Sequence, residues 1–183
     1  MSDVCDQLGI PKYLWTEGRH NIEIGDLDSL YRRVPSHFFE TGAISGKISA
    51  TAFPLKNDSY NLASLCQQPQ DVLFSIKQGV PHFLDDGIIQ INVSGIRAFN
   101  FQYSGGNNQT YECTLKVIHK SEKCMYPHSE ICVFVNGVNQ NPPSSRQAKE
   151  AIRLALRENH DIIMNPPERD LENNDRVDES FGE

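Results

Sequence analysis

The sequence lacks the features that mark membrane-spanning, exported and disulfide-stapled proteins. No run of about 18 apolar residues occurs, so no membrane-spanning helix is expected. The N-terminus carries acidic residues where a signal peptide needs basic ones, which predicts a cytoplasmic protein. The five cysteines are odd in number and scattered along the chain, which predicts reduced thiols rather than a disulfide framework.

Positive charge is also scarce, because 17 lysines and arginines face 24 aspartates and glutamates, for a net charge of −7. Seven of the acidic residues lie between Pro166 and Glu183, together with two arginines, so this segment carries −5 and the rest of the chain −2. A nearly neutral body lacks the basic face that general nucleic-acid binding requires. We expect residues 166–183 to form a disordered, flexible acidic tail.

The patterning of the remaining chain predicts one α+β domain. At 183 residues, 38% of them hydrophobic, the chain is long enough to bury a core. Strands and helices do not alternate regularly, so we expect a mostly antiparallel sheet of about five to seven strands with two or three packed helices. Residues 1–28 are expected to form an N-terminal strap and residues 29–165 the domain. The predicted strands are Ser29–Val34, Tyr60–Leu65, Gly87–Val93, Asn100–Tyr103, Tyr111–His119, Ser129–Asn136 and Ile162–Met164, and the predicted helices are Pro69–Gln78, one turn within Asn92–Phe99, and one that begins after Ser144 or Ser145.

The strands Tyr111–His119 and Ser129–Asn136, with the polar loop between them, hold three cysteines and two histidines. Thiolates and imidazoles are the ligand types of tetrahedral zinc. Cys113 and His119 would lie roughly 20 Å apart along one strand. The easier zinc site is therefore His119, Cys124 and His128. The alternative is that no cofactor is bound and the cysteines act as small apolar side chains.

The pair His128 and Glu130 predicts an acid–base group, because alternate residues of a strand share a face and a carboxylate orients a neighbouring imidazole. The alternative is a pair that satisfies backbone groups at a hairpin edge.

Arg32 shares a strand face with Leu30 and Val34, and a buried arginine needs a carboxylate or a bound anion beside it. The anion would be a phosphate or a carboxylate, held by Arg32 or Arg33 with His37 and with Ser49 and Thr51 of the following segment rich in glycine and serine. The alternative is an ion pair between Arg32 and an acid such as Glu112 or Glu130. With Glu130, the set resembles in residue types the pocket of ADP-ribosyl-transferring enzymes, which implies arginine for the dinucleotide, serine or threonine on a strand, and glutamate for the ribose.

No nucleophile-elbow, P-loop or dinucleotide-binding motif occurs, so no motif is diagnostic of one reaction. Two hypotheses follow. The favoured one is a small cytosolic binding or accessory protein that acts through a protein partner, which its acidic tail would contact. The other is an enzyme for a nucleotide-like or phosphate-bearing substrate, with catalytic residues Arg32, His37, His128 and Glu130 and cofactor-binding residues Ser49 and Thr51. The enzyme hypothesis requires Arg32, His128 and Glu130 to converge on one cleft.

Overall fold

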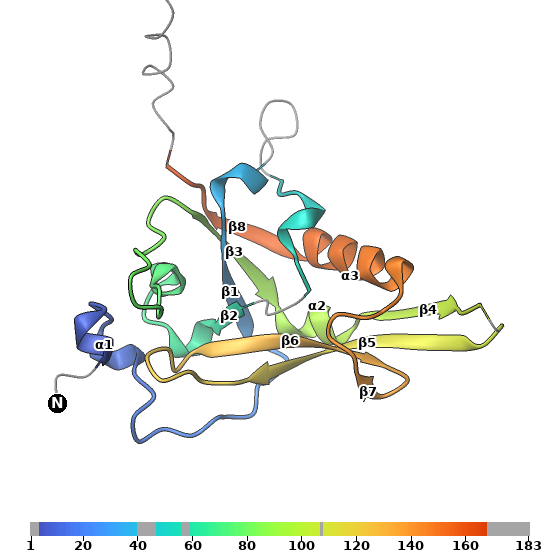
Figure 1. Ribbon diagram of the computed structural model, residues 1–183, viewed down its shortest axis with the longest axis horizontal. Helices are drawn as coiled ribbons and strands as arrows, with labels where there is room; N and C mark the ends of the chain where they lie inside the picture. Colours follow the sequence, from blue (N-terminus) through green and yellow to red (C-terminus); the bar gives the residue numbers. More distant parts are fainter. Residues whose placement is uncertain (1–3, 40–46, 56–58, 107, 168–183) are drawn as a thin grey trace, which may run out of the picture.

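The computed structural model describes residues 4–39, 47–55, 59–106 and 108–167. Within them, one curled antiparallel sheet has the strand order β4-β5-β6-β2-β1-β3-β8, with the short β7 paired to β6 (Figure 1). This confirms the predicted α+β class, with an eight-stranded sheet in place of five to seven strands. The strands are β1 Ser29–Val34, β2 Ser59–Leu62, β3 Gly87–Asn92, β4 Asn100–Ser104, β5 Thr110–His119, β6 His128–Val135, β7 Val138–Asn139 and β8 His160–Met164.

The helices are few and short among the described residues. The α-helices are α1 Val4–Gln7, α2 Val93–Arg97 and α3 Arg146–Glu158, and the 3-10 helices are η1 Lys12–Leu14, η2 Ser36–Phe38, η4 Ala50–Ala52, η5 Ala63–Leu65 and η6 Pro69–Leu73. None of these helices combines the length and the apolar character needed to cross a membrane.

The hydrophobic core lies between α3 and the concave side of the sheet (Figure 1). Ser145 caps α3, because its side-chain oxygen accepts from the backbone N–H of Ala148 at 3.2 Å. Ala148, Ile152 and Leu156 are the buried residues of the helix, at the spacing of one helical face. The prediction of a cap at Ser144 or Ser145 therefore matches the structure, with Ser145 as the cap.

Two predicted elements end early. The helix expected over Pro69–Gln78 is a 3-10 helix that stops at Leu73. The buried Asp71 caps its start, because its carboxylate accepts from the backbone N–H groups of Gln67 and Gln68. The strand expected over Tyr60–Leu65 stops at Leu62 and continues as η5. Both early stops leave irregular backbone beside the sheet, where side chains can line a cavity.

Residues 4–28 run along one end of the sheet and dock on the connection between β5 and β6 (Figure 1). The backbone N–H of Tyr126 donates to the carbonyl of Leu14 at 2.6 Å, and the N–H of Thr16 donates to the carbonyl of Lys123 at 3.1 Å. The N–H of Ser121 donates to the side-chain oxygen of Asn21 at 3.0 Å. This N-terminal segment therefore fixes the shape of the β5–β6 connection.

A disulfide joins Cys5 of α1 to Cys124 of the β5–β6 connection, across a sequence separation of 119 residues. The prediction that all thiols are reduced is wrong for this pair, and Cys66, Cys113 and Cys132 are free. An odd count shows only that at least one cysteine lacks a disulfide partner, and a separation of 119 residues gives no local signal. Because disulfides persist mainly in oxidising compartments, the cysteines no longer support a cytoplasmic location, which stays a prediction.

The disulfide leads to a test of the N-terminal docking. The double substitution Cys5→Ser with Cys124→Ser should lower the free energy of unfolding by about 2–4 kcal/mol, because the crosslink restricts the unfolded chain. Denaturant unfolding of both proteins measures this difference. As a control, thiol titration of the unfolded, unreduced wild type should count the three free cysteines, and five after reduction. Five thiols before reduction would contradict the pairing.

Candidate functional site

One cleft gathers most of the polar side chains that lie near the start of β2. Its cavity volume is about 490 Å³. We call it the β2 cleft, and its charged and polar lining residues are Arg32, Arg33, Ser59, Asn61, Ser75, Lys77, Glu122, His128 and Glu130.

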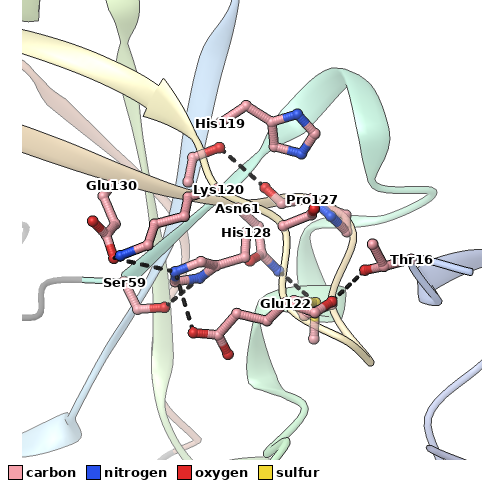
Figure 2. Close-up of polar contacts among 12 residues, drawn as sticks. Thr16, Ser59, Asn61, His119, Lys120, Glu122, Pro127, His128 and Glu130 are labelled. Atoms are coloured by element: carbon pink, nitrogen blue, oxygen red, sulfur yellow. Dashed lines mark hydrogen bonds and ion pairs between the residues drawn. The ribbon is translucent and has the colours of Figure 1, made fainter. Parts of the chain in front are cut away.

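The strand register assembles one wall of the cleft. Ser59 of β2 lies opposite Glu130 of β6, and Asn61 lies opposite His128. Residues two apart on a strand share a face, so these four side chains stand together (Figure 2). The β5–β6 connection adds Glu122, whose carbonyl accepts a hydrogen bond from the hydroxyl of Thr16. The N-terminal segment thus helps to hold Glu122 at the cleft.

His128 is the centre of this wall. The Oγ of Ser59 lies 2.9 Å from its Nδ1. Its Nε2 lies 3.6 Å from a carboxylate oxygen of Glu122 and 3.9 Å from one of Glu130, which also pairs with Lys120 at 2.9 Å (Figure 2). Two carboxylates favour the proton on Nε2, so that Nδ1 accepts from the Ser59 hydroxyl.

Burial lowers the pKa of His128 below its ordinary value, although the carboxylates of Glu122 and Glu130 oppose this effect. The side chain of His128 is only 7% exposed. His128 is therefore neutral at neutral pH and has a nitrogen ready to accept a proton. This is the state that a general base requires.

The opposite wall is cationic and aromatic. Arg33 pairs with Asp86 at 2.6 Å, and its guanidinium carbon lies 3.6 Å from the centre of the Phe83 ring. An arginine has five N–H donors, so this pairing leaves donors for a ligand. Lys77 adds a second, exposed cation, and Phe74 adds a second ring. The cleft therefore has one wall built around His128 and one that suits an anion.

Arg32, His128 and Glu130 all border the β2 cleft, but they lie on opposite faces of the sheet. Arg32 shares the core face of β1 with Leu30 and Val34, whereas His128 and Glu130 share the face of Asn61. Arg32 is 6% exposed, and its Nη2 donates to the carbonyl of Ala52 at 2.6 Å. Its guanidinium also lies over the rings of Phe53 and Tyr60, at 5.1 and 5.6 Å. The guanidinium of Arg32 is therefore held in place by contacts with other residues of this protein. Catalytic roles for these residues stay predictions.

The other three residues of the predicted enzyme pocket lie outside the lining of the β2 cleft. His37 is exposed on η2, with its ring 4.1 Å from that of Phe38. Ser49 is hydrogen bonded to Thr51 at 2.7 Å, and Thr51 borders a separate depression beside α3. The residue set that resembles an ADP-ribosyl-transferring pocket is therefore not gathered in one place.

The predicted zinc ligands are not assembled either. Cys124 is in the disulfide, so it offers no thiolate. Both ring nitrogens of His119 have protein partners, since Nδ1 accepts from the N–H of Ile22 at 2.9 Å and Nε2 lies 2.6 Å from the carbonyl of Tyr126. Among the described residues, no group of three histidine, cysteine, aspartate or glutamate side chains is placed to hold a metal ion.

Sequence reasoning missed Ser59, Asn61, Lys77 and Glu122. Ser59 and Asn61 come near His128 only through strand pairing, since Ser59 and His128 are 69 residues apart, and Lys77 reaches the cleft from another segment. Glu122 lies six residues before His128, but no regular spacing marks it, because a turn brings the two side chains together. The acidic tail, on which the protein-partner hypothesis rests, lies largely outside the described residues, and that hypothesis stays a prediction.

The buried histidine predicts a loss of stability on acidification. A lowered folded-state pKa means that the unfolded chain binds a proton first as the pH falls. The stabilising contribution of neutral His128 is therefore complete above the ordinary histidine pKa of about 6.5 and declines as the pH falls toward the folded value. Thermal melts across this range measure the slope of stability against pH, which His128→Gln should reduce.

Glu122, Glu130 and Lys120 all act on the His128 charge, so the control must leave them in place. His20→Gln, at an exposed histidine, provides this control and should leave the slope unchanged. His160, whose pKa burial also lowers, accounts for part of the remaining slope. An unchanged slope in His128→Gln would contradict the assignment.

Comparisons with known proteins do not supply a function, because no protein family, curated protein or solved structure matches this chain.

Proposed function

We propose that this chain is an enzyme with its active site in the β2 cleft, and that His128 acts there as general base and acid on a small phosphate-bearing, nucleotide-like substrate. The observation that carries the proposal is the placement of His128, which is 5% exposed, lines the cleft and holds the Ser59 hydroxyl 2.9 Å from Nδ1. A neutral imidazole at hydrogen-bonding distance from a hydroxyl in a cavity is an acid–base arrangement.

The cleft has a suitable size and charge distribution for such a substrate. Its volume of about 490 Å³ falls within the range of small-molecule sites. Arg33 and Lys77 attract a phosphate on one wall, while Glu122 and Glu130 repel it on the other. This polarity orients the substrate, with its phosphate toward the cations and its remaining part toward His128. The rings of Phe74 and Phe83 offer apolar contact for a base or a similar ring.

Phosphate recognition can be tested by binding. In NMR titrations with adenosine monophosphate and with inorganic phosphate, we expect shifts of Arg33, Lys77 and His128 signals. Lys77→Ala should weaken nucleotide binding about tenfold, because a charge-assisted contact is lost. Lys47→Ala, at an exposed lysine outside the cleft lining, should have no effect. Shifts confined to other surfaces, or none with either ligand, would refute phosphate binding here.

The acid–base role can be tested by turnover. Small phosphorylated compounds, nucleotide esters among them, are incubated with the protein and their consumption is followed by mass spectrometry. His128→Gln should slow any turnover about 100-fold or more, because general acid–base catalysis contributes at least that factor. His20→Gln should turn over like the wild type. Equal rates in His128→Gln would remove His128 from the reaction.

A further inference from the structure

We propose that Ser59 is the nucleophile of this site and that the reaction is acyl transfer, in which a carboxylic ester of the phosphate-bearing substrate passes its acyl group to the Ser59 oxygen. The inference rests on the proposed function and deepens it, because it names the bond that breaks. It starts from the position of the Ser59 hydroxyl between solvent and the buried His128.

His128 lies between a hydroxyl and two carboxylates, which is the arrangement that nucleophilic catalysis by a serine needs. Ser59 lies at one ring nitrogen and two carboxylates lie at the other, as in the logic of a serine–histidine–acid triad. In that triad the hydroxyl lies at Nε2 and the acid at Nδ1, whereas here the hydroxyl lies at Nδ1 and the acid at Nε2. Because the two nitrogens belong to one conjugated ring, a proton gained at Nδ1 is stabilised by a carboxylate facing Nε2. Glu122, at 3.6 Å, is the nearer carboxylate in this arrangement.

Ser59 is also accessible, which a nucleophile must be. Its side chain is exposed and lines the cleft, whereas His128 behind it is buried. A substrate in the cleft therefore meets the hydroxyl first and the base second. Ser75 lines the same cleft, but its Oγ accepts from the backbone N–H of Lys77 at 3.3 Å, and its described contacts include no base at the hydroxyl.

The charges near Ser59 favour a neutral carbonyl over a phosphoryl group as the reacting centre. Glu130 lies opposite Ser59 across the strands, and Glu122 lies on the far side of His128. A phosphate placed at Ser59 would meet the carboxylate of Glu130, which Lys120 neutralises in part, and like charges in a partly buried site repel. An ester carbonyl carries no net charge, so it can occupy this position while the phosphate of the same molecule stays near Arg33 and Lys77.

Asn61 offers a donor for the negative charge that develops on the carbonyl oxygen. It shares a face of β2 with Ser59 and lines the cleft. Its Nδ2 donates to the sulfur of Met125 at 3.2 Å, and a thioether is a weak acceptor. Exchange of this sulfur for an oxyanion would strengthen the hydrogen bond in the transition state, which is how an oxyanion donor lowers a barrier.

The reaction balances with water as the only co-reactant. The Ser59 oxygen attacks the acyl carbon, its proton passes to Nδ1 of His128, and the ester C–O bond breaks as the leaving alcohol takes that proton. Water then attacks the acyl-serine and gives a proton to Nδ1. The Ser59 oxygen leaves the acyl carbon and regains the proton, and the carboxylic acid is released.

The test is labelling of the full chain with diisopropyl fluorophosphate, in which a serine–phosphorus bond forms and fluoride leaves. Intact mass and peptide mapping should find one adduct, on Ser59. The labelling rate of His128→Gln should be at least about 100-fold lower than that of the wild type. Ser59→Ala should not label, and Ser94→Ala, at an exposed serine of α2, should label like the wild type. If Ser59→Ala does not fold, Ser59→Cys retains the side-chain size and should be alkylated by iodoacetamide at position 59 with the same dependence on His128.

The outcomes separate the inference from the function on which it rests. An adduct on Ser59 that depends on His128 supports the inference. Absence of an adduct, an adduct on another residue, or equal labelling in His128→Gln overturns it. If turnover still requires His128 in that case, the enzyme proposal stands and water takes the place of Ser59 as the nucleophile. If Ser59 is labelled but Lys77→Ala leaves nucleotide binding unchanged, the phosphate-bearing substrate is refuted while the nucleophile stands.

Discussion

The four-residue strand β2 is the constraint on which the rest of the structure depends. It lies between β6 and β1, so it joins the half of the sheet formed by β4, β5 and β6 to the half formed by β1, β3 and β8. The side chains of β2 point alternately into the core and into the cleft. Tyr60 and Leu62 are fully buried in the core, while Ser59 and Asn61 line the cleft. A shift of one residue in its register would expose the core residues and bury the polar ones, so packing and site geometry are specified together.

The chemistry of the cleft follows from its surroundings rather than from rare residue types. Burial keeps His128 neutral, and two carboxylates at the other nitrogen stabilise the charge that it gains with a proton. Lys120 neutralises part of the acidic wall through Glu130. The guanidinium of Arg33 lies over the Phe83 ring and pairs with Asp86, and both contacts order it beside the cleft. The two walls thus differ in charge across one small cavity.

The sequence predicts local features well and long-range ones poorly. Alternation along Ser29–Val34 predicts the buried face of β1, including the inward Arg32, because a strand has a fixed side-chain period. A serine before an apolar stripe predicts the cap of α3. By contrast, the register that places Asn61 opposite His128, and the disulfide at Cys124, depend on segments tens of residues apart. His128 and Glu130 could be found because they lie on one strand, whereas Ser59 could not, because 69 residues separate it from His128.

The N-terminal docking also bears on how the chain is made. Residues 8–15 are synthesised before the surface that Ile10 and Leu14 pack against, because that surface includes Met125, more than a hundred residues later in the chain. Until Met125 has been synthesised, Ile10 and Leu14 lack part of the surface that they pack against. The docking of the N-terminal segment on the β5–β6 connection, which brings the Thr16 hydroxyl to the carbonyl of Glu122, therefore follows the synthesis of that connection.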